Sequence, residues 1–154
     1  TSSATKQAAV AAAGAAAVID RRNGDIRGAL RAALPDGADV VIDPGGGELA
    51  EPALRALRPG GGFVTVGYAA GAIPRIPLNL VLLKGIAIVG FEFLGFAMRE
   101  PEALAAGDAA LDRLVAEGAV VPVIGARFPL SEAAQALRTL ADGAVPGKVV
   151  IDIG

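Results

Sequence analysis

The sequence contains no cysteine and no histidine, and only 4% of its residues are aromatic. Without cysteine there is neither a disulfide framework nor thiolate chemistry, which fits a reducing compartment, and we expect a cytoplasmic location. Without cysteine and histidine the chain also lacks the usual zinc ligands and the commonest general base. We therefore predict no metal ligands and no catalytic side chain within it.

A strong charge of either sign and a long apolar run are missing as well. The formal net charge of -2 gives no broad basic face, which disfavours binding to nucleic acid or to an anionic membrane. The apolar run over residues 8–17 is too short to cross a bilayer and is interrupted by Gly14, and no basic segment precedes it. We predict neither a signal peptide nor a membrane span.

The 154 residues are 53% hydrophobic, which suits one globular domain, and helix and strand patterns alternate along them. The apolar periodicity and the turn residues predict helices over 5–13, 25–33, 49–57, 78–84 and 101–117, and strands over 17–19, 39–42, 62–67 and 86–90. Continuously apolar strands favour a parallel sheet with helices on both faces. After Gly118 we expect an extended run over 120–124, a helix capped by Ser131 that continues to 140, and a strand over 147–151.

Six short motifs follow one another along the chain. They are Ser2-Ser3-x-x-Lys6, Gly14-Ala15-x-x-x-Ile19-Asp20, Asp39-Val40-Val41-x-Asp43, Leu54-x-x-Leu57-x-Pro59-Gly60-Gly61, Val66-Gly67 and Gly147-Lys148-Val149-Val150. Together they resemble the cofactor domain of medium-chain dehydrogenases/reductases. The resemblance is closer to the quinone oxidoreductase branch, the zeta-crystallin-like enzymes that use NADPH without zinc. It covers the whole chain, and the order and spacing of the motifs make it specific.

The resemblance implies an α/β fold, a Rossmann-type doubly wound parallel sheet that lacks its first strand-turn-helix unit and the N-terminal GroES-like domain. We divide the chain into a partial NAD(P)-binding domain over 1–118 and C-terminal elements over 119–154 that pack towards the missing catalytic domain. In the usual strand order 3-2-1-4-5-6, two central strands would separate the strand at Val18 from the strand at Val40. We therefore expect a fragment that is inactive alone.

In such a sheet the ligand lies across the carboxyl ends of the strands. Ser2, Ser3 and Lys6 follow the point where the second strand would end and the adenosine ribose would arrive. Hydroxyl groups and a cation suit a 2'-phosphate, so we predict NADPH over NADH. Arg21 stands where the resembled family often carries a tyrosine, and it could contact the same phosphate in a bidentate manner. Alternatively, these residues are a helix cap and solvated charges.

Two further groups follow predicted strands. Asp43 and Gly45 either only end a strand or also let the backbone approach the ribose and pyrophosphate closely. Gly67 ends a buried strand where a side chain would collide with a nicotinamide ring, and Val66 and Tyr68 flank it. An ordinary strand-to-loop glycine is the alternative.

The same resemblance implies that the backbone of Phe91-Glu92-Phe93 lies along the carboxamide group of the nicotinamide. An aromatic pair at this place would also suit a core or a dimer interface. The strand at 86–90 is expected to pair with its copy in a second subunit, which predicts a homodimer.

The implied reaction is hydride transfer from NADPH to a small-molecule electron acceptor, either a quinone or an α,β-unsaturated carbonyl. Two alternatives stay open. Leu57-Arg58-Pro59-Gly60-Gly61 before a strand also occurs in S-adenosylmethionine-dependent methyltransferases, but those place an antiparallel strand near their end, whereas the strand at 86–90 is expected to be parallel. The other alternative is a non-catalytic fragment that only binds nucleotide or dimerises.

Overall fold

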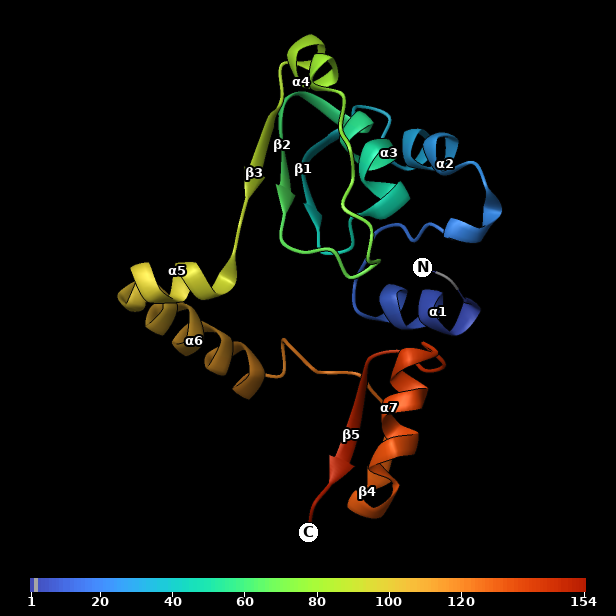
Figure 1. Cartoon of the computed structure of the whole chain (residues 1–154), viewed down its shortest axis with the longest axis vertical. Helices are drawn as coiled ribbons and strands as arrows, with labels where there is room; N and C mark the ends of the chain where they lie inside the picture. Colours follow the sequence, from blue (N-terminus) through green and yellow to red (C-terminus); the bar gives the residue numbers. More distant parts are fainter. Residues whose placement is uncertain (2) are drawn as a thin grey trace. The chain divides into compact units, whose positions relative to one another are not determined.

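The computed structural model of the chain describes residues 1 and 3–154. It divides into two compact units (Figure 1): unit 1 consists of residues 1–22 and 109–154, and unit 2 consists of residues 23–108. Helix α6, Pro101–Ala116, continues from the sequence of unit 2 into that of unit 1. The division predicted at 118/119 concerns packing against a further domain, and it stays a prediction.

Unit 2 is built on a parallel three-stranded sheet in the order β1-β2-β3. Its strands are β1 Ala38–Asp43, β2 Leu57–Thr65 and β3 Ala87–Gly90. The central residue Phe63 pairs with Val41 on one side and with Ile88 on the other. The predicted parallel direction of the third strand is confirmed, and this is the feature that separates the chain from the methyltransferase alternative.

The helices of unit 2 are α2 Ile26–Ala33, α3 Ala50–Arg55, α4 Leu78–Lys84 and α5 Phe93–Arg99, with a short 3-10 helix η2 Gly47–Leu49. Helix α3 contacts β1 and β2, and its fully buried Leu54 joins Phe63 in the core. On the other face of the sheet Val40 and Ile42 are 57% and 69% exposed. Within this unit, helices cover one face of the sheet, where we expected both.

Two boundaries of unit 2 differ from the sequence prediction. Helix α3 ends at Arg55, and β2 already begins at Leu57, where we predicted the end of a helix. Leu57 pairs with Ala38, and the register then shifts, so that Val40 pairs with Gly62. The glycine-rich segment therefore bulges within the strand and does not precede it, since the parallel partner β1 holds both of its ends.

Unit 1 contains helix α1 Ala4–Ala12, the parallel strands β4 Ile124–Pro129 and β5 Lys148–Asp152, and helix α7 Ala133–Ala141. The 3-10 helix η3, Leu130–Glu132, leads from β4 into α7. Helix α7 contacts both strands and buries Ala136 against them. Helix α1 ends at Ala12, Ala13 caps it, and Gly14 follows with a φ of +96. This confirms the predicted glycine stop.

Two local predictions for unit 1 are wrong. Residues 17–19 do not form a strand, because no strand in the described part of the chain pairs with them. The extended run predicted over 120–124 leads into β4, which begins at Ile124, where β5 provides its partner. Ser131 lies inside η3 and does not cap α7, which begins after Glu132 without a side-chain cap.

None of the helices in residues 3–154 has both the length and the hydrophobicity that crossing a bilayer requires.

Candidate functional site

The loops that follow β1 and β2 are hydrogen-bonded to each other at the carboxyl edge of the sheet in unit 2. The amide of Val66 donates to the carbonyl of Asp43 at 3.0 Å, and the amide of Ala70 donates to the carbonyl of Gly45 at 2.9 Å. Parallel strands bring their carboxyl ends to one edge, and this is where ligands bind in open α/β sheets. Three of the predicted residues, Asp43, Gly45 and Val66, therefore lie together.

Asp43 is the charged side chain at the end of β1. Its Oδ1 accepts hydrogen bonds from the amides of Gly45 and Gly46, each at 2.9 Å, which fixes the orientation of the carboxylate. Its Oδ2 is buried and has no hydrogen-bond partner among the described residues. A buried carboxylate oxygen without a donor is costly, so a ligand hydroxyl that donates to Oδ2 would be stabilised there.

Gly46 also belongs to this edge, although Gly45 is the only glycine of this run that was predicted as a site residue. It is buried, its φ of 65 and ψ of -141 are open to glycine almost alone, and it sits between the two loops. A Cβ at this position would lie 2.8 Å from Tyr68 Cδ1 and 3.0 Å from the carbonyl oxygen of Ala72. The only available signal was its place in the run Gly45-Gly46-Gly47, which does not say which glycine is constrained.

Gly67 and Tyr68 follow β2 directly in the loop that crosses this edge. A Cβ on Gly67 would lie 3.4 Å from the carbonyl oxygen of Pro44, at the limit of ordinary van der Waals contact, so the packing of the two loops does not itself require glycine here. The side chains of Val66 and Tyr68 are 38% and 42% exposed. The backbone of this loop is thus close to the Asp43 turn, and its side chains are accessible.

The third strand also ends at this edge. The amide of Phe91 donates to the carbonyl of Thr65 at 3.0 Å, which brings Phe91 beside the end of β2. Glu92 caps helix α5, where its carboxylate accepts from the amide of Leu94 at 2.9 Å. Phe93 is the first residue of α5 and is 63% exposed. The Phe91 ring meets that of Phe96 at a centroid distance of 5.3 Å.

The predicted phosphate-binding residues lie in unit 1. Ser2 lies outside the described residues. The Ser3 hydroxyl oxygen accepts from the amide of Lys6 at 3.2 Å and so caps α1, which leaves its own proton to donate. The amide of Arg21 donates to the carbonyl of Thr1 at 2.9 Å, so Arg21 lies next to the start of α1. The structure thus brings Ser3, Lys6 and Arg21 to one region of this unit.

The neighbouring Asp20 has an altered acidity. The hydrogen bonds from the Arg22 side chain and backbone, followed by its charge, hold the pKa of Asp20 well below its ordinary value. Arg22 Nε donates to Asp20 Oδ1 at 3.0 Å, and Gln7 Nε2 donates to Oδ2 at 2.8 Å, which ties the loop to α1. Arg22 is therefore neutralised by Asp20, whereas Arg21 forms no ion pair within the described part of the chain.

In residues 1 and 3–154 no group of three or more acidic, cysteine or histidine side chains is placed to hold a metal ion. The chemistry of the carboxyl edge is instead that of backbone amides, glycines and the Asp43 carboxylate, since the Glu92 carboxylate is bonded to the amides of α5. This donor set fits hydroxyl and phosphate groups.

A sequence model of a family described as zinc-binding dehydrogenase matches residues 13–151. The chain belongs to this family. Among curated relatives, quinone oxidoreductase-like protein 2 of Bos taurus is 31% identical over 132 residues, which cover 82% of this chain and 38% of that protein. The resemblance to the cofactor domain of quinone oxidoreductase-like medium-chain enzymes is confirmed.

Solved structures agree with the fold. A mycobacterial protein complexed with NADPH superposes with a TM-score of 0.83 at 25% identity, and the match covers 98% of this chain and 47% of that one. A NAD-dependent alcohol dehydrogenase superposes with a TM-score of 0.77 at 27% identity, over 100% of this chain and 43% of that one. The chain therefore spans less than half the length of these proteins. The residues described here do not fit a zinc site, in spite of the family's description.

Proposed function

We propose that this chain is the cofactor-binding part of an NADPH-dependent oxidoreductase that transfers hydride to a quinone or an α,β-unsaturated carbonyl. The observation that carries the proposal is the oriented carboxylate of Asp43, whose buried Oδ2 has no partner among the described residues, at the carboxyl edge of a parallel sheet. Membership in the zinc-binding dehydrogenase family supports it.

Each part of the edge would have its own task. Asp43 Oδ2 would accept from a ribose hydroxyl, and Gly45 would let the backbone approach the sugar and the pyrophosphate. Val66, Gly67 and Tyr68 would flank the nicotinamide ring, with the backbone of Phe91 beside them. NADPH supplies the hydride when bound, and the protein supplies orientation and the exclusion of water.

The preference for NADPH rests on unit 1. A 2'-phosphate needs cations and hydrogen-bond donors, and charge-assisted contacts contribute about 1.5 to 3 kcal/mol each. The Ser3 hydroxyl proton, the Lys6 ammonium group and the Arg21 guanidinium group would provide them, because Arg22 is already paired with Asp20. Since NAD-dependent and NADPH-binding proteins both share this fold, the preference has to be measured.

The role proposed for Glu92 and Phe93 is limited to their backbone. The Glu92 carboxylate is already engaged by the amides at the start of α5. Phe93 is largely exposed, and a partner subunit would bury it.

The test is the equilibrium binding of NADPH and NADH to the natural protein that carries this chain. We expect tighter binding of NADPH. Lys6→Gln should weaken NADPH binding roughly tenfold and leave NADH binding almost unchanged, because only NADPH carries the extra phosphate. Lys148→Gln, which removes an exposed lysine from β5, is the matched control and should change neither.

Equal affinities for the two dinucleotides, or an equal loss of both in Lys6→Gln, would contradict the assigned preference. Binding of neither would favour a fragment that serves assembly only. Consumption of NADPH on addition of a quinone, followed by the absorbance of the reduced nicotinamide, tests the reaction itself.

We also propose a homodimer through the strand at 86–90. Strand β3 is an edge strand of the described sheet, and its Ile88 and Val89 are 40% and 49% exposed. Such an edge offers backbone groups and apolar side chains to a second copy. Light scattering after size exclusion should give twice the protomer mass, and Val89→Lys should give the monomer, whereas Ile73→Lys in an exposed loop should stay dimeric.

A further inference from the structure

A cleft lies at the amino edge of the sheet in unit 2, at the opposite end of the strands from Asp43. Its volume is about 520 Å³. Gly37, just before β1, and Leu57, the first residue of β2, form part of its wall, together with Lys84 at the end of α4. A volume of this size falls within the range of small-molecule sites. Nothing in the proposed NADPH site uses these residues.

Asp36 is the single acidic side chain among the residues that line this cleft. Five basic side chains line it: Arg27, Arg31, Arg55, Arg58 and Lys84. Glu51 Oε1 forms ion pairs with Arg27 Nη2 at 3.1 Å and with Arg55 Nε at 2.8 Å, so one carboxylate neutralises part of the charge of two guanidinium groups. Arg58 pairs with Asp39. Within the described part of the chain, Arg31 and Lys84 form no ion pair, and an excess of positive charge remains.

The remainder of the wall is apolar. Leu30 and Leu34 come from α2 and the turn after it, Pro52 from α3, and Leu80 from α4. Charged groups predominate in this cleft, and the leucine and proline side chains beside them add an apolar surface on which an organic group can rest, while the charges fix its orientation. A bare inorganic ion would use only the charges.

We propose that this cleft binds a phosphate monoester with a compact apolar group. A phosphate monoester carries a charge of about -1.5 to -2 at neutral pH, which matches two unpaired cations better than a monocarboxylate does. The Arg31 guanidinium group can contact two phosphate oxygens at once, and the Lys84 ammonium group adds a point charge. The apolar group lies against the leucine and proline wall.

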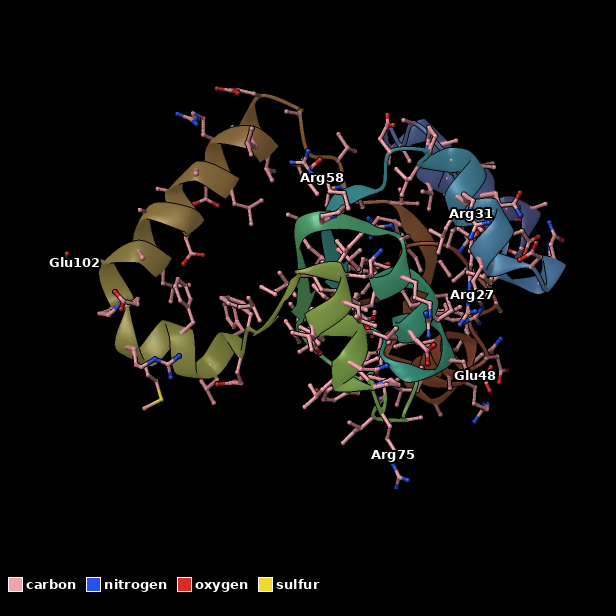
Figure 2. The ribbon with its side chains drawn as sticks, turned by 90° about the horizontal axis from the view of Figure 1, so that it is seen from above. Arg27, Arg31, Glu48, Arg58, Arg75 and Glu102 are labelled. Carbon is pink, nitrogen blue, oxygen red and sulfur yellow. The ribbon has the colours of Figure 1, made fainter. Side chains whose placement is uncertain are left out.

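This site is separate from the cofactor edge, because the strands are parallel and the two sites lie at their opposite ends. Its occupation can therefore be measured independently of NADPH binding, and the proposal does not depend on the proposed function. Figure 2 shows Arg27 and Arg31 on α2, and Arg75 projecting outward from a different part of the chain.

The first experiment titrates the chain with phenyl phosphate while the backbone amide resonances are followed by NMR. We expect saturable shifts at the amides of Gly37, Arg58 and Lys84 and none at those of Gly45 and Gly67. Inorganic phosphate, which lacks the ring, should bind at least about tenfold more weakly than phenyl phosphate. Phenol, which lacks the charge, should also bind at least about tenfold more weakly. Shifts at the carboxyl edge alone, or equal affinity for phenyl phosphate and inorganic phosphate, would overturn the proposal.

The second experiment compares charge variants. Arg31→Gln and Lys84→Gln should each weaken phenyl phosphate binding roughly tenfold, because each removes one charge-assisted contact. Arg75→Gln makes the same charge change outside the cleft and should leave the affinity unchanged. Since neither Arg31 nor Lys84 forms an ion pair within the described residues, both variants should keep the fold, which the NMR spectrum of the free protein checks. Unchanged affinity in both cleft variants, or an equal loss in Arg75→Gln, would refute the assignment.

Discussion

Replacing Gly46 by alanine perturbs the carboxyl edge at its most constrained point. The residue is buried and has φ 65 and ψ -141, where a side chain is strained. The new methyl group would also lie 3.0 Å from the Ala72 carbonyl oxygen and 2.8 Å from the Tyr68 ring. The ring is 42% exposed and can turn aside, but the carbonyl can move only with its loop.

The magnitude follows from these two effects. A residue held in a sparsely populated backbone region costs about 1 to 3 kcal/mol, and crowding in a packed site costs about 1 to 3 kcal/mol. Rotation of Tyr68 relieves part of the crowding. We therefore expect Gly46→Ala to lower the free energy of unfolding by about 2 to 4 kcal/mol.

Gly45→Ala is the matched control in the same turn. Its backbone does not have a positive φ, and a Cβ there would meet only Asp43 Oδ1, at an ordinary 3.6 Å. The same one-carbon change should therefore cost less than about 1 kcal/mol.

Urea unfolding followed by tyrosine fluorescence is the direct assay. Tyr68 is the chain's single tyrosine, and the sequence has no tryptophan, so the signal reports on this edge. The urea midpoint of Gly46→Ala should fall well below that of Gly45→Ala, with the dependence of stability on urea unchanged. Equal midpoints for the two variants would refute the claim that the Gly46 backbone is held in this conformation.

Three further predictions concern packing, charge and capping. Leu54→Ala should lower the free energy of unfolding by about 2 to 5 kcal/mol, whereas Leu83→Ala should change it by less than about 0.5 kcal/mol, as measured by urea unfolding. Leu54 is 0% exposed and Leu83 is 78% exposed. Equal effects of the two substitutions would contradict the place of Leu54 in the core. NMR titration of the Asp20 carboxylate should give a midpoint below its ordinary 3.8, and Arg22→Gln should raise it. Because the pKa of Asp20 is lowered in the folded state, the Asp20–Arg22 pair stabilises the fold above about pH 4, and its contribution is lost as the pH falls further. If Arg22→Gln leaves the Asp20 titration midpoint unchanged, the pair does not form. Glu92→Ala should destabilise α5 by about 0.5 to 2 kcal/mol, seen as faster amide exchange in its first turn, and unchanged exchange would argue against the cap.

Local signals predicted most of the helices. Helix α4 has the predicted bounds of 78–84, and α1 stops before Gly14, because glycine stops and apolar spacing act over a few residues. Strands depend on distant partners. Residues 17–19 have suitable side chains but no pairing strand in the described structure, and Leu57 becomes part of β2 only because Ala38 lies opposite. Helix α5 was missed because its cap is Glu92, a residue less usual at that position than serine or aspartate.

The sequence predicted those residues of the candidate site whose position depends only on the order and direction of the strands. Residues after parallel strands meet at one edge, and Asp43, Gly45 and Val66 do so. The sequence could not show that Asp43 Oδ2 is buried without a partner, since this depends on atoms of the neighbouring loop. It also could not rank the three adjacent glycines, because only the folded chain buries Gly46 and packs it against Tyr68 and the Ala72 carbonyl.

The division of the chain bears on the order in which it folds. Unit 2 is one continuous stretch, residues 23–108, in which every strand pairs with the next one in sequence. Unit 1 combines residues 1–22 with residues 109–154, so it cannot close until the whole of unit 2 has left the ribosome. The entropy lost in joining its two segments is smaller once the intervening stretch is compact, because the effective loop is then short. Unit 2 is therefore expected to form first, before the two segments of unit 1 join each other.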